Sequence, residues 1–465
     1  QLPQNLPPVA APYQYPGLML LLTNTPACCC SLPMPLPAAA TKMLYPAAGQ
    51  TSTPPPPPPA QYPNTQTCCM TTVATSDTVY SFPTMATNTK LLQAKSLYKT
   101  IKNETSARVK PSEGQSINRF EKGSMMDPTS MKTNWNRTFE LTQTSPRAGV
   151  LLLHGMSDSP YSLRHLGKTF HEAGASVIGL RIPGHGTAPS GLVKTTWKDM
   201  AAAVRLAAKH LKESIGDHPL YLVGYSNGGA LSVIYATESV NDPSLPRPDG
   251  LLLLSPEIGV SKAAALAVWQ GRIGHWLGLE KLAWNSISME YDPFKYGSFA
   301  VNAGDQAHRI TTEIDKRLGK MAQDGAMQNF PRTLAFQSSV DATVSTTALI
   351  SRLFDRLPDQ GHELILFDIN RLALVEHLLS KDPADQLEGL LAETDHTFSL
   401  TVVSNSMEEG VPSRRVNLRR REAGTMETIE KSTEMSWPDE TFSLSHIAIP
   451  FPSVKNIRVK NTTSN

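Results

Sequence analysis

Six short runs of apolar residues follow one another after residue 147. In each run the apolar residues are adjacent instead of alternating with polar ones, which is typical of a strand buried on both faces of a sheet. The runs are GVLLLHG (149–155), SVIGLRIPG (176–184), PLYLVGYS (219–226), GLLLLSP (250–256), TLAFQSSVD (333–341) and ELILFDIN (363–370). We expect six strands that share one core.

Helical patterns lie between the first three runs. After the first run, apolar residues recur every three or four positions until Gly174, at Leu163, Leu166, Phe170 and Ala173. After the second run, Thr196 and Asp199 have the spacing of a capping box. An apolar stripe follows at Trp197, Met200, Val204 and Leu211. Alternating strands and helices predict an α/β fold with a mainly parallel sheet, helices on both faces, and functional groups at the carboxyl ends of the strands.

An aromatic-rich insertion at about residues 260–328 interrupts this alternation. Its large rings are Trp269, Trp276, Trp284, Tyr291, Phe294, Tyr296 and Phe299. Aromatic side chains supply much of the lining of ligand pockets, and closing segments exclude water from reactions. We expect a helical lid over a substrate pocket, with many of the rings also packing onto the sheet.

The first 120 residues differ sharply in composition from the rest. Up to Lys90 the charged residues are Lys42, Asp77 and Lys90, and Pro54–Pro59 is an unbroken proline run. Such a segment cannot bury enough apolar surface to offset the entropy lost on ordering. We therefore expect a disordered tail at residues 1–120 and a folded domain at residues 121–465. All five cysteines lie in the tail, so no disulfide is expected within the domain.

Charge and hydropathy exclude some classes of partner. The 43 basic and 41 acidic residues nearly balance, which argues against binding to nucleic acid. No apolar run approaches the roughly 20 residues of a membrane span. The stretch GLMLLLTNTPA before Cys28 weakly resembles a secretion or lipid-attachment signal, but no basic residue precedes it. This pattern is a weak indication of a cell-envelope or secreted protein, and the sequence leaves both the compartment and the oligomeric state open.

The most informative motif is Gly224-Tyr225-Ser226-Asn227-Gly228. It matches the nucleophile elbow G-x-S-x-G, and it has the required context of a buried strand before it and a helix after it. The serine of an elbow takes a strained turn, and glycines two residues away on each side relieve the crowding. We therefore predict that Ser226 is a nucleophile.

Acyl transfer also needs backbone amides that stabilise the oxyanion. The Asn227 amide comes with the elbow, and the Met156 amide follows the first strand after His154-Gly155. These two amides are the predicted oxyanion hole. His154 continues the strand, and we expect its imidazole to bond nearby backbone instead of transferring protons.

Several segments together resemble the bacterial α/β-hydrolases of the serine aminopeptidase and monoacylglycerol lipase type. They are HGMSDSPYSLRHLG, GLRIPGHGTAPSG, GYSNGGAL, YDPFKYGSFAVNAG and VDATVS, and the resemblance covers about residues 135–452. It implies an α/β-hydrolase fold and a serine hydrolase without a metal or cofactor. The implied activity is that of a carboxylesterase or lipase, acting on small-molecule ester or acyl substrates through an acyl-enzyme.

In this fold the acid follows the nucleophile and precedes the histidine along the chain. Asp341 fits because it closes the fifth run at its carboxyl end, although an aspartate there could also cap the following helix. Glu257, just after the fourth run, is the competing acid. Asp355 lies inside a predicted helix and Asp368 inside a predicted strand, so both fit less well.

Among the histidines after Asp341, we predict that His446 is the base. It follows TFSLS, and the segment SLSHIAIPFP resembles the one that carries the family's catalytic histidine. His396 is the alternative, but it precedes an apolar run and so faces the entering end of the sheet, as His362 does. His377 lies in a helical pattern.

The long separation of Asp341 and His446 predicts a second insertion at about residues 371–440. Its basic stretch SRRVNLRRREAG is expected to be a solvated loop and not a binding patch.

Two other functions remain open at this point. One is a serine aminopeptidase for short peptides, which would need acidic groups for the substrate amine. The insertion offers Glu280, Glu290, Asp292, Asp305 and Glu313 without a telling arrangement. The other is an inactive binding module that keeps the elbow for packing.

Overall fold

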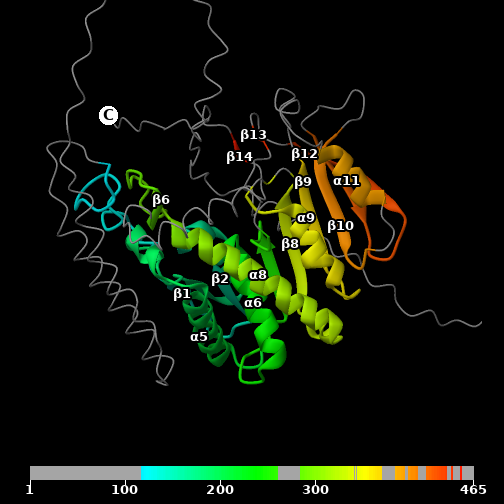
Figure 1. Ribbon diagram of the computed structural model, residues 1–465, viewed down its shortest axis with the longest axis horizontal. Coiled ribbons are helices and arrows are strands. Elements are labelled where there is room, and N and C mark those ends of the chain that lie inside the picture. The colour runs from blue at the N-terminus through cyan, green and yellow to red at the C-terminus, as the bar shows by residue number, and fades with distance from the viewer. Residues whose placement is uncertain are drawn as a thin grey trace, which may run out of the picture.

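One large sheet organises the protein in the computed structural model, which describes residues 117–259, 283–339, 341, 343–368, 383–392, 396–406, 415–436, 441–442 and 451–452. Through these residues the order of the ten strands is β1-β3-β2-β4-β5-β8-β9-β10-β11-β12 (Figure 1). The seven strands from β3 to β10 are parallel. Strand β1 is antiparallel at one end of the sheet, and β11 and β12 are antiparallel at the other.

The sheet strands are β1 (Phe139–Leu141), β2 (Ala148–Leu153), β3 (Ala175–Leu180), β4 (Leu220–Tyr225), β5 (Gly250–Leu254), β8 (Arg332–Ser338), β9 (Glu363–Asp368), β10 (Ser399–Asn405), β11 (Arg415–Arg421) and β12 (Thr428–Ser436). Two small pairs join β6 (Trp284–Ser286) with β7 (Phe299–Ala300), and β13 (Thr441–Phe442) with β14 (Phe451–Pro452). The six strands predicted from the apolar runs are confirmed as β2, β3, β4, β5, β8 and β9.

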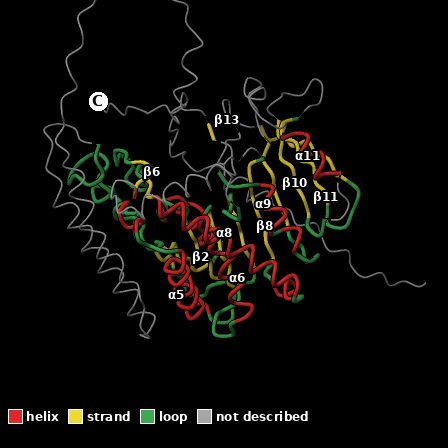
Figure 2. Tube along the Cα trace, viewed as in Figure 1, coloured by secondary structure: helices red, strands yellow, loops and turns green. Residues whose placement is uncertain are grey.

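The α-helices alternate with these strands, as Figure 2 shows. They are α4 (Arg164–Glu172), α5 (Trp197–Ile215), α6 (Asn227–Asn241), α8 (Val301–Gln323), α9 (Thr346–Arg352) and α11 (Pro383–Ala392). Short 3-10 turns are η1 (Pro160–Leu163), η2 (Pro189–Val193), η4 (Ala326–Asn329) and η5 (Phe354–Arg356). None of the helices in the described part of the chain is long and apolar enough to span a membrane.

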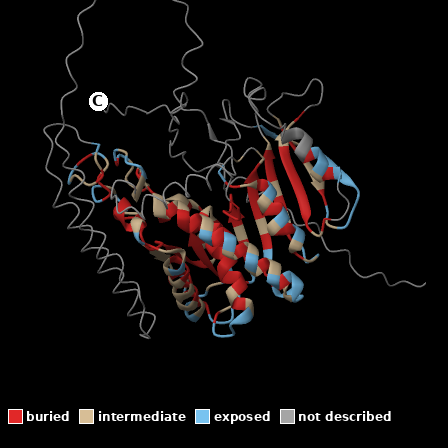
Figure 3. Cartoon of the chain, in the orientation of Figure 1, coloured by how far each residue is buried: buried red, intermediate tan, exposed pale blue. Residues whose placement is uncertain are grey.

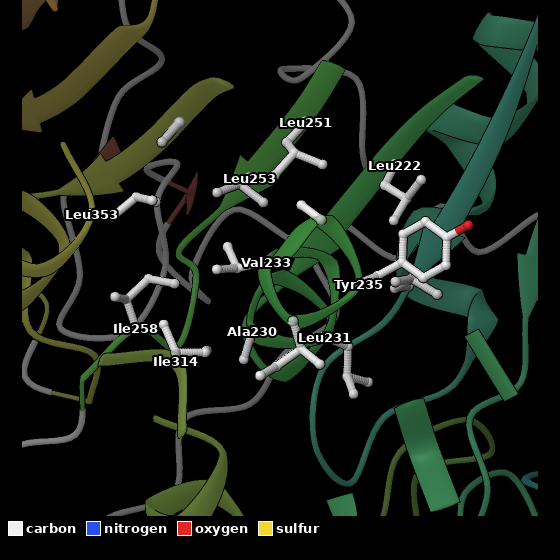
Figure 4. Close-up of a cluster of buried hydrophobic side chains, with 14 of the residues drawn as sticks. Leu222, Ala230, Leu231, Val233, Tyr235, Leu251, Leu253, Ile258, Ile314 and Leu353 are labelled. Carbon is white, nitrogen blue, oxygen red and sulfur yellow. The ribbon is translucent and has the colours of Figure 1, made fainter. Parts of the chain in front are cut away.

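Both faces of the sheet are buried, which explains the unbroken apolar runs (Figure 3). On β2, Leu151 and Leu153 belong to one buried cluster, whereas Val150 and Leu152 belong to a second cluster on the other face. The first cluster holds α5, α6 and α8, and Figure 4 shows side chains of α6 facing those of β4 and β5. Each such side chain contributes about 1.5–3 kcal/mol when fully buried. The predicted mainly parallel α/β sheet is therefore confirmed.

Helix α5 begins with the predicted capping box. The Thr196 hydroxyl accepts from the Asp199 amide at 3.3 Å, and the Asp199 carboxylate accepts from the Thr196 amide at 2.9 Å. The helix ends at Gly216, whose φ of +59° is costly for other residues. In the apolar stripe Met200, Val204 and Leu211 are fully buried against the sheet, whereas Trp197 is partly buried.

The described part of the aromatic insertion packs against the rest of the domain. Helix α8 places Ile310, Ile314 and Leu318 in the same buried cluster as α6. Trp269 and Trp276 lie outside the described residues, as do the tail up to residue 116 and all five cysteines. The lid function of the insertion stays a prediction.

The basic stretch after residue 412 was predicted to be a solvated loop, and that prediction is wrong. Residues 415–421 form β11, which pairs with β10 and β12 in the main sheet. Val416 and Leu418 alternate with polar residues and pack into the second buried cluster. The charges are balanced locally: Arg420 pairs with Glu363 and Glu422, and buried Arg421 donates to backbone carbonyls. Paired arginines thus let a basic segment extend the sheet.

Candidate active site

Ser226 stands at the turn between β4 and α6. Its φ of 53° and ψ of −116° lie in a region that non-glycine residues rarely adopt. Three backbone amides hold its carbonyl oxygen: those of Gly229 at 2.8 Å, Ala230 at 3.2 Å and Glu257 at 3.0 Å. These bonds maintain the strained turn that the elbow motif predicts.

The neighbouring glycines are required by space. A Cβ on Gly224 would lie 2.4 Å from the Gly228 carbonyl oxygen, and one on Gly228 would lie 2.0 Å from the Leu153 carbonyl oxygen. A Cβ on Gly229 would lie 2.7 Å from Pro256 Cβ. The contacts are mostly to backbone, which cannot move aside cheaply, so the turn tolerates little but glycine here.

The loop after β2 lies directly against the nucleophile. A Cβ on Gly155 would be 3.3 Å from Ser226 Cβ. The His154 imidazole accepts from the Ile182 amide through Nε2 at 3.1 Å, so Nδ1 carries the proton and donates to the Gly155 carbonyl at 2.9 Å. Burial, together with nearby His185, holds the pKa of His154 well below its usual value, which keeps the ring neutral. His154 is the backbone-bonded imidazole that the sequence predicts.

That bond to Gly155 also orients the next amide. The carbonyl of Gly155 and the N–H of Met156 belong to one planar trans peptide and point in opposite directions. Because the carbonyl faces His154, the Met156 N–H points away from that ring. Asn227 begins α6, so its N–H is among the first four amides, which have no partner within the helix.

Asp341 follows β8 at the carboxyl edge of the sheet. Its Oδ1 accepts from the amides of Thr343 at 2.9 Å and Val344 at 3.0 Å, whereas Oδ2 is buried without a partner. Burial raises the pKa of Asp341 to about 6, and the two amides oppose that rise. The cap of α9 is Ser345 and not Asp341, since Ser345 Oγ accepts from the Ala348 amide. Oδ2 is therefore the atom that could hold an imidazole.

The competing acid, Glu257, is joined to the nucleophile through its backbone. Its backbone amide bonds to Ser226, its carboxyl group is buried, and Oε2 has no partner. Burial alone raises the pKa of Glu257 to about 7. Two residues before Glu257 stands Ser255, a buried serine with φ of 42° whose side chain lowers the pKa of Asp341. The sequence analysis missed Ser255, although its position directly after a strand was a usable signal.

The described histidines after Asp341 lie at the opposite edge of the sheet. His362 precedes β9 and accepts from the Thr333 amide through Nδ1 at 3.1 Å. His396 precedes β10, its Nε2 lies 2.9 Å from the Leu390 carbonyl, and the Ser399 amide bonds the His362 carbonyl. A strand of six or seven residues separates the two edges by roughly 20 Å. Neither histidine can reach Ser226 from there.

His446 and His377 lie outside the described residues. The strands β13 and β14 pair antiparallel on either side of residues 443–450, with Phe442 opposite Phe451. Figure 1 draws this pair beyond the edge toward which β8 and β9 point. The assignment of His446 as the base stays a prediction.

A surface cavity of about 560 Å³ lies apart from these groups, at the far end of α6. Glu238 within it bonds both Arg205 and Arg317, at 2.9 and 3.1 Å. The lining holds three basic and three acidic residues, so its charges balance, and Ser226 is not among the lining residues.

Residues 144–369 match the family model "Serine aminopeptidase, S33". The thermostable monoacylglycerol lipase of Bacillus sp. (strain H-257) is 35% identical over 88 residues, which are 19% of this chain and 34% of that lipase. The chain therefore spans about a third of the length of this curated relative.

Two solved structures are also similar. A structure from a study of the metagenome-derived lipolytic enzymes LipS and LipT has a TM-score of 0.40 and 23% identity, over 56% of this chain and 96% of its own. The monoacylglycerol lipase of Paleococcus ferrophilus has a TM-score of 0.38 and 21% identity, over 50% of this chain and 88% of its own. The family match ends one residue after β9, and it includes the elbow, the loop after β2 and Asp341. Residues 144–369 therefore lie in a domain with the α/β-hydrolase fold, and they are similar to the serine aminopeptidase family and, over a shorter stretch, to a monoacylglycerol lipase.

Proposed function

We propose that this protein hydrolyses carboxylic esters through an acyl-enzyme on Ser226. The observation that carries the proposal is the strained Ser226, held between β4 and α6 with the Gly155 loop against it. Backbone strain of this kind is typical of functional sites. The lipase and esterase names of the similar proteins support the same substrate class.

In the proposed mechanism His446 takes the proton of Ser226 Oγ as that oxygen attacks the acyl carbon. Asp341, through Oδ2, holds the imidazole in the tautomer that accepts this proton. The N–H groups of Met156 and Asn227 bind the oxyanion of the tetrahedral intermediate. The alcohol leaves with the proton from His446, and water then attacks the acyl-enzyme by the same route.

The pKa of Asp341 gives this mechanism a pH dependence. An acid that orients an imidazolium must be ionised, and burial raises the pKa of Asp341 to about 6. Activity should therefore rise as the pH passes through this value, provided that the histidine is neutral in the same range.

Peptide hydrolysis is the second candidate, because the family model is described by serine aminopeptidase. It is favoured by one observation, the buried carboxyl group of Glu257 near Ser226, which could receive a substrate amine. Comparing turnover of p-nitrophenyl esters and aminoacyl p-nitroanilides in one preparation distinguishes the two activities.

The proposal is tested by labelling the full chain with a fluorophosphonate and mapping the modified peptide. We expect the label on Ser226, and a loss of ester hydrolysis on the order of 10⁴-fold in Ser226→Ala. Ser214→Ala is the matched control, because Ser214 is exposed on α5. No label on the wild type would instead indicate an inactive binding module, and more than a tenth of the activity in Ser226→Ala would show that Ser226 is not the nucleophile. A p-nitrophenyl ester series of increasing acyl length then separates esterase from lipase preference.

A further inference from the structure

The segment between β6 and β7 is held firmly on the N-terminal part of the domain. The Arg119 amide donates to the Glu290 carbonyl at 2.9 Å, and the Arg119 guanidinium donates to the Lys295 carbonyl at 3.0 Å. Asn136 donates to the Pro293 carbonyl at 2.7 Å. These three contacts fix the backbone of the segment from one side.

Acidic side chains fix the same backbone from within. Glu290 accepts from the amides of Gly297 at 3.1 Å and Ser298 at 2.8 Å. Asp292 accepts from the amides of Phe294 at 2.7 Å and Lys295 at 3.0 Å. Two of the carboxylates considered above for substrate binding therefore have structural partners here.

Tyr296 links this segment to two loops at the carboxyl edge of the sheet. Its amide donates to the Ser157 carbonyl at 2.8 Å. Its hydroxyl donates to the Gly184 carbonyl at 3.1 Å and accepts from the Thr187 amide at 2.9 Å. The side chain is 5% exposed, so these bonds lie in the interior, where losing one leaves a buried group without a partner.

The loop that Tyr296 holds is the one that carries the Met156 amide. Ser157 has φ of 60°, so the backbone next to Met156 is strained and needs a restraint. On the other side of Met156, His154 holds the Gly155 carbonyl. The two restraints are coupled, since the His185 ring lies parallel to Tyr296 and contacts His154 edge-on with ring centres 5.0 Å apart.

We propose that Tyr296 is a positioning residue for the oxyanion hole, which it reaches through Ser157 and through the loop of residues 184–187. The inference rests on the proposed function, because the Met156 amide has a catalytic role only in acyl transfer. The segment between β6 and β7 would then contribute to transition-state stabilisation, because it holds the loop of the Met156 amide in place.

The test compares Tyr296→Phe with the matched control Tyr291→Phe in the full chain. Tyr296→Phe keeps the ring and the backbone bond and removes both hydroxyl bonds, whereas Tyr291 is an exposed tyrosine of the same segment. We expect kcat for a short p-nitrophenyl ester to fall about tenfold in Tyr296→Phe while KM changes less than twofold, because the oxyanion exists only in the transition state. The control should keep the wild-type kcat.

Two measurements separate positioning from loss of folded protein. Titration with the fluorophosphonate counts competent sites, and kcat is expressed per labelled Ser226. Amide hydrogen exchange in the peptide of residues 154–161 should become faster in Tyr296→Phe and not in the control. An unchanged kcat per labelled site, or unchanged exchange, would overturn the inference. An unlabelled wild type would instead refute the proposed function.

Discussion

The two edges of the main sheet are built from the same strands but differ in character. At the carboxyl edge the backbone is strained: among the described residues, the non-glycine residues with positive φ are Ser157, Ser226 and Ser255, which follow β2, β4 and β5. At the same edge the carboxyl groups of Asp341 and Glu257 each have one buried oxygen without a hydrogen-bond partner. At the amino edge His362 and His396 each bond to a backbone group through one ring nitrogen, and the Nε2 of His362 is also buried without a partner.

This difference indicates where the protein gives up stability for function. Strained backbone and unpartnered polar groups cost free energy and persist where the surrounding structure enforces them. Here the enforcing structure is the buried core between the two edges. Chemical activity is therefore expected at the carboxyl edge, and substitutions at the two edges should have different consequences.

The largest expected effect is a difference in ester hydrolysis between variants of His446 and of His396. His446→Ala should lower ester hydrolysis on the order of 10⁴-fold, and the double variant with Ser226→Ala should be no worse, since the members of a triad act as a unit. His396→Ala should lower it less than about tenfold, because His396 lies at the amino edge. Initial rates on one soluble ester measure both. A large loss in His396→Ala together with a small loss in His446→Ala would identify His396 as the base. It would also refute the expectation that the chemistry takes place at the carboxyl edge.

The second effect concerns backbone space. Gly228→Ala should cost more than about 3 kcal/mol of unfolding free energy, because its Cβ would lie 2.0 Å from the Leu153 carbonyl oxygen. Gly319 lies near the end of α8, toward the amino edge, and its Cβ would meet no atom closer than 3.8 Å. Gly319→Ala should therefore stabilise the helix by about 1 kcal/mol.

Urea unfolding of both glycine variants measures these changes. A Gly228→Ala protein as stable as the wild type would mean that the elbow is less crowded than its geometry requires.

The third effect is on how stability changes with pH: the contribution of Glu257 at the carboxyl edge falls as the pH rises, whereas that of His362 at the amino edge falls as the pH decreases. Folding raises the pKa of Glu257 from 4.5 to about 7, so the folded state holds a proton that the unfolded state releases. Its contribution to stability is complete below pH 4.5 and is lost as the pH rises through 7. The unfolding free energy of Glu257→Gln, measured relative to that of the wild type, should therefore rise by about 3 kcal/mol between pH 4 and pH 8.

His362 provides the opposite sign at the amino edge. Burial lowers the pKa of His362 from 6.5 to about 4, so its contribution is present above pH 6.5 and is lost as the pH falls through 4. His362→Asn, which keeps an acceptor for the Thr333 amide, should gain relative stability in acid. Urea unfolding at several pH values measures the unfolding free energy of both variants. If this free energy changed with pH in the same way in Glu257→Gln and in the wild type, the Glu257 carboxyl group would be solvated and not buried.

Much of the fold could be predicted because its causes are local in sequence. The run before Ser226 forms a strand buried on both faces, and Thr196 with Asp199 caps α5 through groups three residues apart. The elbow was predictable for the same reason, since its glycines and Ser226 lie within five residues of one another. The proposed acid and base are harder, because their roles depend on which edge each residue reaches.

Other features depend on contacts between distant residues. Nothing near Tyr296 in sequence indicates that its hydroxyl bonds Gly184 and Thr187, more than a hundred residues away. Strand β11 was missed because four arginines obscured the alternation of Val416 and Leu418. The acidic partners that let Arg420 lie in a sheet are Glu363 of β9 and Glu422 just after β11.

Strand β12 ends the sheet, and its side chains bear on whether two copies of the chain can join. Within the described residues no strand pairs with its outer edge, and Ile429 and Met435 are exposed there. A symmetric antiparallel pairing of two β12 strands along their full length, Thr428–Ser436, would be centred on Ser432. It would set Glu430 of each copy opposite Glu434 of the other, and like charges in direct opposition destabilise such a pair. The same register would set the exposed Ile429 of each copy opposite Met435 of the other, so the two glutamates oppose an apolar contact that would otherwise favour pairing.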